Sequence, residues 1–167
     1  MHRAALLIGG NQGDRHSLLL QATDLIRQRI GSVALLSSIQ ETEPWGDFEI
    51  QNSESEIQNF LNQALVVDTP LSPHDLLREA LAIEHTLGRR RKLLPPPSSL
   101  LPRQYSSRPI DIDIIFYDHA IISTPDLTVP HPRMHLRRFV LEPLAEVMPD
   151  YVHPLLHKTV KQLLSEL

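Results

Sequence analysis

The chain of 167 residues contains no cysteine, and aromatic residues make up only 5% of it. Without cysteine, disulfide bonds, zinc–thiolate sites and thiol nucleophiles are excluded. Long apolar runs are missing as well, because the first one, residues 4–8, is too short for the core of a signal peptide or for a membrane span. These absences fit a cytoplasmic protein with no membrane partner.

A strong positive charge is also missing. The 16 lysines and arginines are outnumbered by 20 aspartates and glutamates, which gives a net charge of −4. A general nucleic-acid binder would be basic overall, so nucleic acid is not an expected partner. The length suits one domain with a sizeable core, and we therefore expect residues 1–167 to fold as a single domain.

Hydrophobic periodicity predicts a core of strand, helix, strand, strand, helix and strand. The two helices have Asp14 and Ser72 as N-caps and end at Gly31 and Gly88. This order predicts an α+β fold, a ferredoxin-like sandwich whose βαββαβ core has an antiparallel sheet with helices, followed by C-terminal helical additions. The predicted strands cover residues 3–8, 33–40, 57–69 and 108–118, and the C-terminal helices cover residues 135–147 and 159–167.

A glycine-rich segment, residues 9–14, separates the first strand from the first helix. It lacks the Gly-Lys-Ser/Thr sequence of a Walker A phosphate loop. We therefore interpret it as a tight turn between the two elements.

Two aspartates share one face of the last core strand. Alternation along a strand places Ile110, Ile112 and Ile114 on one face. Asp111 and Asp113 then lie on the other face, about 7 Å apart. Their repulsion is roughly 2 kcal/mol at an effective dielectric of about 20. The strand alone is equally compatible with a solvated sheet face and with a site for one or two divalent cations.

Basic side chains gather on both sides of that strand in the sequence. Four in a row, residues 89–92, follow the second helix. Cations after a helix C-terminus interact favourably with the helix dipole, but four exceed what capping needs. They favour an anion site. The cations that suit a polyphosphate are Arg89, Arg91, Lys92, Arg108 and Arg137.

Several of the aromatic residues lie near breaks in the predicted elements, where they suit a planar heteroaromatic ligand. A loop tryptophan is also a common packing anchor. The aromatic residues in question are Trp45, Phe60, Tyr105 and Phe139.

Two further polar residues each have two interpretations. Asn62, at the start of the third strand, is either a turn or ladder residue or an amide that reads a ligand edge with both a donor and an acceptor. His131, between two prolines, is either a surface histidine or a hydrogen-bonding residue for phosphate. A zinc site shared by His131 and His135 is disfavoured because Pro132 lies between them.

Metal-binding carboxylates, clustered cations and stacking surfaces together suit phosphoryl or pyrophosphoryl transfer. Two other hypotheses stay open, since each element also has a simpler explanation. One is a non-catalytic ferredoxin-like module that binds a nucleotide or an acidic partner through the basic loop. The other is a structural domain with solvated aspartates. Nucleotide binding that depends on the two aspartates separates the enzyme from both.

The same stretches resemble the family of 6-hydroxymethyl-7,8-dihydropterin pyrophosphokinases, enzymes of folate biosynthesis. The resemblance covers nearly the whole chain. Its most specific part is an Arg-x-x-Asp-x-Asp strand at residues 108–113 followed by Val-Pro-His at residues 129–131. The other stretches that carry it are residues 7–15, 41–46, 60–62, 84–92 and 137–139.

This resemblance implies that ATP gives its β,γ-pyrophosphoryl group to the hydroxymethyl oxygen of the pterin, and that AMP leaves. It implies two magnesium ions held by Asp111 and Asp113, and catalytic roles for Arg89 and Arg108 in stabilising the transferring charge. ATP and the pterin are the expected partners of a monomer. The implied pterin pocket consists of Thr42, Pro44, Trp45, Phe60, Asn62, Tyr105 and Phe139, and the implied ATP contacts also include Glu84, Arg91, Lys92, Ile114, Thr128, His131 and Arg137.

The chain departs from the usual family pattern at several positions. Tyr105 stands where tryptophan is common, Gln104 where a basic residue is frequent, and Pro132 where a tyrosine is common. The loops at residues 47–56 and 93–102 are longer than in compact members, and we interpret the second as a lid over ATP. These departures bear on lid geometry and nucleotide affinity rather than on the reaction.

Overall fold

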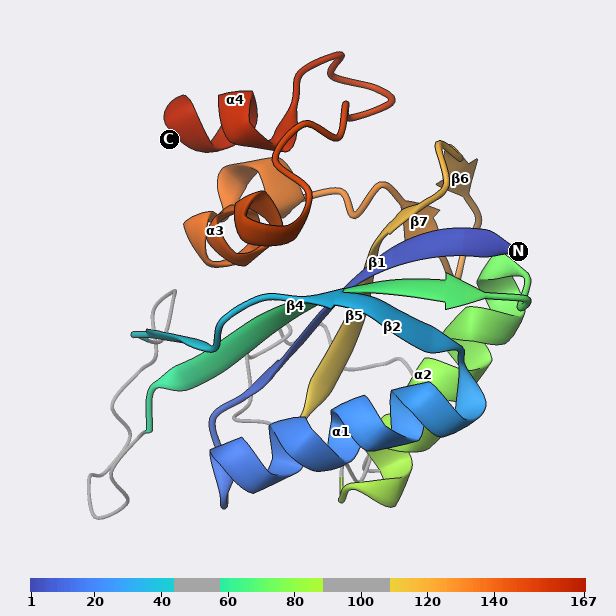
Figure 1. Ribbon diagram of the computed structural model, residues 1–167, viewed down its shortest axis with the longest axis vertical. Helices are drawn as coiled ribbons and strands as arrows, with labels where there is room; N and C mark the ends of the chain where they lie inside the picture. Colours follow the sequence, from blue (N-terminus) through green and yellow to red (C-terminus); the bar gives the residue numbers. More distant parts are fainter. Residues whose placement is uncertain (44–57, 89–108) are drawn as a thin grey trace, which may run out of the picture.

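The computed structural model of the protein describes residues 1–43, 58–88 and 109–167 (Figure 1). These residues form a five-stranded antiparallel sheet in the order β2-β4-β1-β5, and β3 also pairs with β4. The sequence of elements β1-α1-β2-β4-α2-β5 confirms the predicted ferredoxin-like α+β fold. The strands are β1 His2–Gly10, β2 Ser32–Leu36, β3 Gln40–Thr42, β4 Phe60–Thr69 and β5 Asp111–Tyr117.

Two helices cover one face of the sheet, α1 (Arg15–Arg29) and α2 (Pro73–Thr86), and they lie below it in Figure 1. Each begins at its predicted N-cap, because the side chains of Asp14 and Ser72 each accept a backbone N–H of the first turn at 3.2 Å. The main core lies between these helices and the sheet, and it includes Ala4, Leu6, Ile8, Leu19, Ile26, Leu65, Leu76, Ile83, Ile112 and Ile114.

The C-terminal elements cover the opposite face. The 3-10 helix η1 (Met134–Leu136), α3 (Arg138–Val147) and α4 (Val160–Ser165) follow one another there, with α3 and α4 above the sheet in Figure 1. None of the described helices is long and apolar enough to cross a membrane. A second core forms against the sheet from Ala5, Leu7, Ala64, Ile115, Phe116, Met134, Val140, Leu141 and Leu144.

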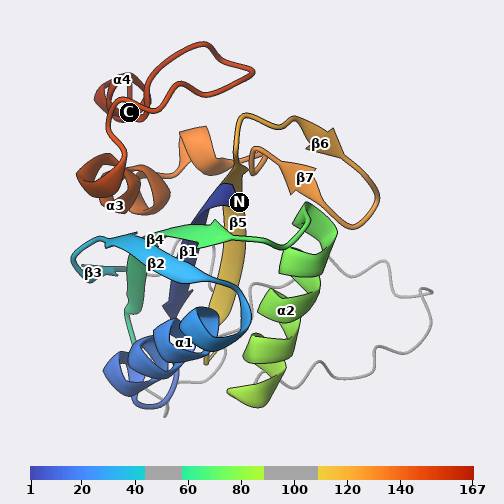
Figure 2. The same cartoon turned by 45° about the vertical axis from the view of Figure 1, so that its right-hand side comes forward.

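A short hairpin connects β5 to these C-terminal elements. It consists of β6 (Ile122–Ser123) and β7 (Thr128–Val129), and it lies near the start of α2 in Figure 2. His74 Nε2 at that end of α2 lies 3.2 Å from Thr124 Oγ1 in the hairpin turn. The hairpin thereby brings the chain back toward β5 before η1 begins.

Some element boundaries differ from those predicted. Gly9 and Gly10 continue strand β1, so the predicted turn begins only after them. The predicted strand at residues 33–40 is interrupted between β2 and β3. The helix predicted to begin at residue 135 instead starts at Arg138. An extended backbone at Arg137, with φ −122° and ψ 106°, separates it from η1.

Strand β5 contains a β-bulge at Ile115. Ile114 pairs with Leu6 and Phe116 pairs with Ala5, so Ile115 is an extra residue on the β5 side. Its carbonyl oxygen accepts a hydrogen bond from the backbone N–H of His131 at 3.0 Å. The bulge therefore attaches the segment after β7 to the strand that carries the two aspartates.

Candidate active site

A polar residue of β4, a glycine of β1 and an aspartate of β5 lie in one row across three neighbouring strands. Gly9 in the central strand β1 pairs with Asn62 of β4 on one side and with Asp111 of β5 on the other. Two residues further along, Leu7 pairs with Asp113. Directly opposite residues of antiparallel strands share a face. The row therefore lies on the face whose other end is covered by α3, since Leu7 belongs to the second core.

The missing side chain of Gly9 leaves space for Asn62. A Cβ atom at Gly9 would meet Asn62 Oδ1 and would lie 2.7 Å from the carbonyl oxygen of Leu61. Asn62 is 6% exposed, and its Nδ2 donates a hydrogen bond to Thr42 Oγ1 at 3.3 Å. Thr42 of β3 thus holds the Asn62 amide against the backbone of Gly9, which has no side chain there. The amide can both donate a hydrogen bond to a ligand and accept one from it.

Asp111 and Asp113 point away from the main core, as predicted. Both are half-buried, whereas Ile112 between them is 4% exposed and packs under the helices. The backbone N–H of Ile112 donates a hydrogen bond to Glu84 Oε1 at 2.8 Å. Glu84 is itself buried at the last turn of α2. The strand segment between the two carboxylates is therefore fixed in place from the helical side.

The sequence predicts a nucleotide contact at Ile114. Its side chain is buried in the main core, so a nucleotide would meet the main chain there. The hydrogen-bonding direction alternates along a strand, and the N–H of Ile112 points away from β1 toward Glu84. The N–H of Ile114, two residues on, points toward the same outer edge of the sheet.

His131 lies beside the aspartates as a neutral ring. Burial, then the positive charge of Arg137 and, less strongly, that of Arg133, lower the pKa of His131 to about 4, and the charge of Asp111 offsets only part of this. The ring Nδ1 accepts a hydrogen bond from the backbone N–H of Arg133 at 3.3 Å. The proton of the neutral ring therefore lies on Nε2, which is the donor that His131 offers.

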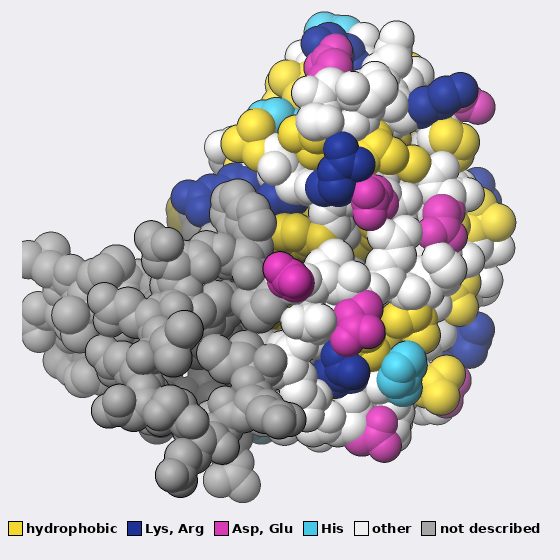
Figure 3. All heavy atoms as spheres, turned by 90° about the vertical axis from the view of Figure 1, so that its left-hand side faces the viewer, with side chains coloured by type: hydrophobic (Ala, Val, Ile, Leu, Met, Phe, Trp, Pro, Cys, Tyr) yellow, Lys and Arg dark blue, Asp and Glu magenta, His cyan; other side chains and the backbone are white. Residues whose placement is uncertain are grey.

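The start of α3 adds a cation and an aromatic ring. The guanidinium carbon of Arg137 lies 5.6 Å from the centre of the Phe139 ring, within cation–π distance. The charge of Arg137 also acts on His131, which is close to Asp111. The structure therefore brings Arg137 and Phe139 to the side of the sheet that carries Asp111. Figure 3 shows lysine and arginine side chains gathered at the upper left of the described surface.

The remaining predicted residues divide into two groups. Phe60 begins β4 directly opposite Thr42, and Thr128 is exposed on β7. The predicted lid at residues 93–102 lies outside the described residues. The same holds for Pro44, Trp45, Arg89, Arg91, Lys92, Tyr105 and Arg108.

Gly9 and Arg133 contribute to this site although they were not predicted to do so. Arg133 donates its backbone N–H to His131, a local contact that its position two residues away allows. Gly9 is significant because its two partner strands carry Asn62 and Asp111. That significance follows from strand pairing, which connects residues more than 50 positions apart, so a local pattern could not reveal it.

A family model described as 7,8-dihydro-6-hydroxymethylpterin-pyrophosphokinase (HPPK) matches residues 5–149. The chain belongs to this family. A curated relative from Porphyromonas gingivalis, named 2-amino-4-hydroxy-6-hydroxymethyldihydropteridine pyrophosphokinase, is 40% identical over 150 residues, which are 89% of this chain and 92% of the relative. A relative of the same name from Methylorubrum extorquens is 38% identical and covers 100% of this chain and 94% of its own.

Solved HPPK structures share the fold at lower identity. The crystal structure of Plasmodium falciparum HPPK-DHPS wild type with pteroate matches 99% of this chain with a TM-score of 0.74 and 18% sequence identity. A crystal structure of HPPK-DHPS in complex with substrates matches the same share with a TM-score of 0.71 and 16% identity. This chain spans 42% and 43% of those two chains, so it corresponds to less than half of either.

Proposed function

We propose that this protein transfers the β,γ-pyrophosphoryl group of ATP to the hydroxymethyl group of 6-hydroxymethyl-7,8-dihydropterin, a step of folate biosynthesis. The hydroxymethyl oxygen bonds to the β-phosphorus, and the bond from that phosphorus to the oxygen shared with the α-phosphorus breaks. AMP leaves with the shared oxygen, and the hydroxyl proton is released. The observation that carries the proposal is the row of Asn62, Gly9 and Asp111, which sets an amide beside the aspartate strand in a chain of this family.

The pterin occupies the β3–β4 end of the row. Asn62 reads the pyrimidine edge, because its amide offers a donor and an acceptor and Thr42 holds it in place. The half-buried rings of Phe60 and Phe139 supply apolar surface for the flat pterin. By the family resemblance, the pocket also includes Pro44, Trp45 and Tyr105.

The triphosphate lies between the aspartate strand and the start of α3. Arg137 offsets phosphate charge, and neutral His131 donates its Nε2–H to a phosphate oxygen. Fixed donors and cations of this kind stabilise charge that shifts during phosphoryl transfer. We assign the remaining ATP contacts by resemblance to Glu84, Arg91, Lys92, Ile114 and Thr128, and the catalytic cations to Arg89 and Arg108.

The aspartate pair fits magnesium. Asp111 and Asp113 are half-buried on one face, so each carboxylate keeps access to solvent for the waters and phosphate oxygens that Mg²⁺ prefers as further ligands. Within the described ranges, no group of three or more His, Asp or Glu side chains could hold a metal ion. By the family resemblance, we assign two Mg²⁺ ions to these two residues together with ATP. When bound, the ions neutralise the triphosphate and favour loss of the hydroxyl proton.

We further propose that residues 1–167 act as one domain and as a monomer in the cytoplasm. The two cores share the five-stranded sheet, and this supports one folding unit. Light scattering should give the mass of one 19.0 kDa chain. Fractionation of the producing cells should recover the protein with cytoplasmic markers.

The reaction is tested with ATP, Mg²⁺ and the hydroxymethyl dihydropterin. We expect one AMP for each pterin pyrophosphate formed, measured by chromatography. ATP labelled at the γ-phosphate should transfer its label to the pterin. A 6-methyl dihydropterin is the matched control, because it keeps the ring but lacks the accepting oxygen.

The released nucleotide separates this reaction from simple phosphate transfer, because both reactions carry the γ-label to the pterin but simple phosphate transfer releases ADP. If no AMP forms with the hydroxymethyl pterin, or if AMP forms equally with the 6-methyl control, the proposed transfer is wrong. Nucleotide binding without any turnover would instead support the non-catalytic module.

A further inference from the structure

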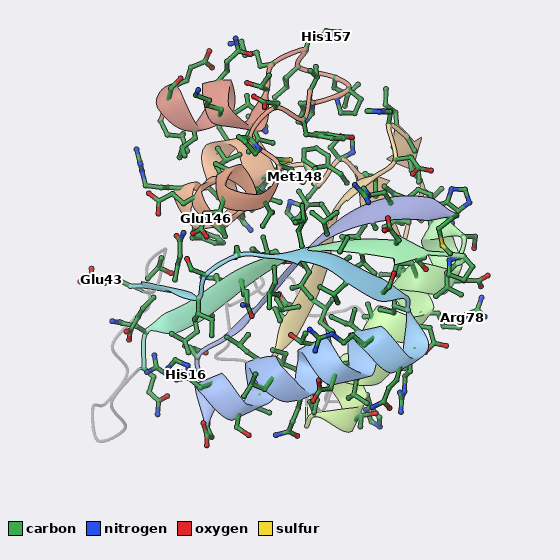
Figure 4. All side chains as sticks on the ribbon, viewed as in Figure 1. His16, Glu43, Arg78, Glu146, Met148 and His157 are labelled. Carbon is green, nitrogen blue, oxygen red and sulfur yellow. The ribbon has the colours of Figure 1, made fainter. Side chains whose placement is uncertain are left out.

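The carboxylate of Glu146 connects α3 to the edge of the sheet through three hydrogen bonds. Its Oε2 accepts the backbone N–H of Ser38 at 2.9 Å, and its Oε1 accepts Ser38 Oγ at 2.6 Å and Gln40 Nε2 at 2.8 Å. The hydrogen bonds from Ser38, and then that from Gln40, lower the pKa of Glu146. Figure 4 shows Glu146 on the side of α3 that faces the sheet.

Ser38 lies where the edge of the sheet is irregular. Leu36 pairs with Leu65 and Gln40 pairs with Asn62, so four steps along β2 and β3 oppose three steps along β4. One residue in this interval is therefore extra, and a bulge of this kind leaves backbone groups without ladder partners. Glu146 provides the acceptor for the Ser38 N–H, and it thereby holds the bulged segment against α3.

Both ends of this contact lead to the pterin pocket. On the sheet side, Gln40 is directly opposite Asn62, and Thr42 two residues further accepts the Asn62 amide. On the helix side, Phe139 precedes Glu146 by seven residues, or two turns. The two side chains therefore lie on nearly the same face of α3, about 10 Å apart along its axis.

We propose that Glu146 is a positioning residue for pterin binding, because it sets the separation between the β3 wall with Thr42 and the helix that carries Phe139. This inference rests on the proposed function of the site. Glu146 acts through Ser38 and Gln40 rather than by contact with the substrate. Among the ATP contacts, the aspartates and His131 are held on the opposite edge of the row by β1, Glu84 and the Ile115 bulge, whereas Arg137 lies at the start of α3. ATP binding therefore depends on the Glu146 contact less than pterin binding does.

The inference is tested by comparing Glu146→Ala with the wild-type enzyme. Without the carboxylate, β3 and α3 spend less time at the separation that binds pterin. If the fraction of molecules with that separation falls to about a tenth, the KM and the Kd of the pterin rise about tenfold. The KM of ATP should change by less than about twofold, and Glu146→Gln, which keeps one acceptor oxygen, should lie between Glu146→Ala and wild type.

Glu142→Ala is the matched control. Glu142 lies on the same helix, but its carboxylate pairs with Arg138 of that helix at 3.1 Å rather than with Ser38 or Gln40. It should leave the pterin KM unchanged. A thermal melt of every variant identifies any loss of folded protein, and Gln40→Ala, which removes one of the three hydrogen bonds, replaces Glu146→Ala if the latter does not fold.

The outcomes separate this inference from the proposed function. An inactive wild-type enzyme would disprove the proposed function. An active wild-type enzyme with equal pterin KM values for Glu146→Ala and Glu142→Ala would overturn the positioning role alone. Equal increases in the KM of pterin and ATP would overturn it too, because they indicate a general loss of structure. A pterin-specific increase that is not enlarged by adding Gln40→Ala supports it, since the two residues then act through one contact.

Discussion

The two faces of strand β5 differ in what they bury and therefore in what they do. Ile112 and Ile114 are 4% and 5% exposed under the helices, and this apolar burial stabilises the fold at about 25 cal/mol per Å². Asp111 and Asp113 on the other face are half-buried, and Asp111 lies close enough to His131 for its charge to act on that ring. Side-chain alternation thus places the apolar residues that stabilise the fold and the two carboxylates that we propose as magnesium ligands on opposite faces of one strand.

The largest effect is expected from a change on the charged face. Asp111→Asn and Asp113→Asn should each lower turnover about 100-fold or more, because each removes a ligand worth several kcal/mol of charge stabilisation. The melting temperature should change little, since neither side chain belongs to the main core or to the second core. AMP release and a thermal melt measure the two quantities.

Asp24→Asn is the control for charge removal, because Asp24 is exposed on the surface of α1, where it pairs with Arg27 at 3.3 Å. It should leave turnover at the wild-type level. Full turnover in both Asp111→Asn and Asp113→Asn would exclude the aspartate pair from the reaction.

The next largest effect is expected on stability rather than on turnover, and it comes from a change on the apolar face of β5. Ile112→Ala should lower the free energy of unfolding by about 2–5 kcal/mol, because it leaves a cavity in the main core. Urea denaturation measures this loss. At a temperature where the variant is folded, its turnover should stay within a few-fold of wild type. A loss as large as that of Asp113→Asn would show that the two faces are not independent.

A smaller effect is expected at Gly9, and it tests whether pterin binding requires a residue without a side chain at this position. Gly9→Ala places a methyl group against Asn62 Oδ1 and Leu61 O, so we expect a loss of about 1–3 kcal/mol in stability and a higher pterin KM. Gly13→Ala is the control. Gly13 has φ +67°, which strains alanine, but its Cβ would meet only Leu18 Cδ1 at 3.8 Å. It should lose stability without a change in pterin KM.

The smallest expected effect is a pH dependence of stability caused by His153, near the second core. Burial, and then the charges of His135 and His157, lower the pKa of His153, which is 3% exposed. The unfolded chain therefore binds more protons, and stability should fall as the pH drops below the unfolded pKa of about 6.5. Thermal melts from pH 7.5 to pH 5 measure this.

His153→Asn should reduce that pH dependence but not abolish it, because the lowered pKa of His131 contributes to the same acid loss. The ring Nδ1 accepts the backbone N–H groups of Leu155 and Leu156, both at 3.1 Å, and an asparagine oxygen offers a similar acceptor that does not titrate in this range. A pH profile identical to wild type would show that another group causes the acid loss.

Much of the fold followed from local patterns. The alternation of isoleucine and aspartate identified the two faces of β5, and the side chains of Asp14 and Ser72 identified two helix starts that the structure confirms. Such features depend on residues within a turn or two of the chain, so the sequence states them directly. The resemblance that named the family rested on the same local stretches, and residues 5–149 match it.

The contacts that organise the candidate site could not be found in this way. Glu84 accepts the Ile112 N–H from 28 positions away, and Glu146 accepts Ser38 from 108 positions away. Gly9 was expected in a turn, but it continues a strand because its partners lie on both sides of it. In each case, the partner is chosen by packing rather than by sequence spacing.

By itself, the sequence determined the order of the elements, the helix caps and the pairing of two carboxylates on one strand face, because backbone geometry imposes these within a few residues. Only the tertiary structure decided that Asn62, Gly9 and Asp111 form one row and that His131 returns to the Ile115 bulge. Strand register is set by burying one face of every strand at once. That requirement belongs to the whole sheet, and no single segment contains it.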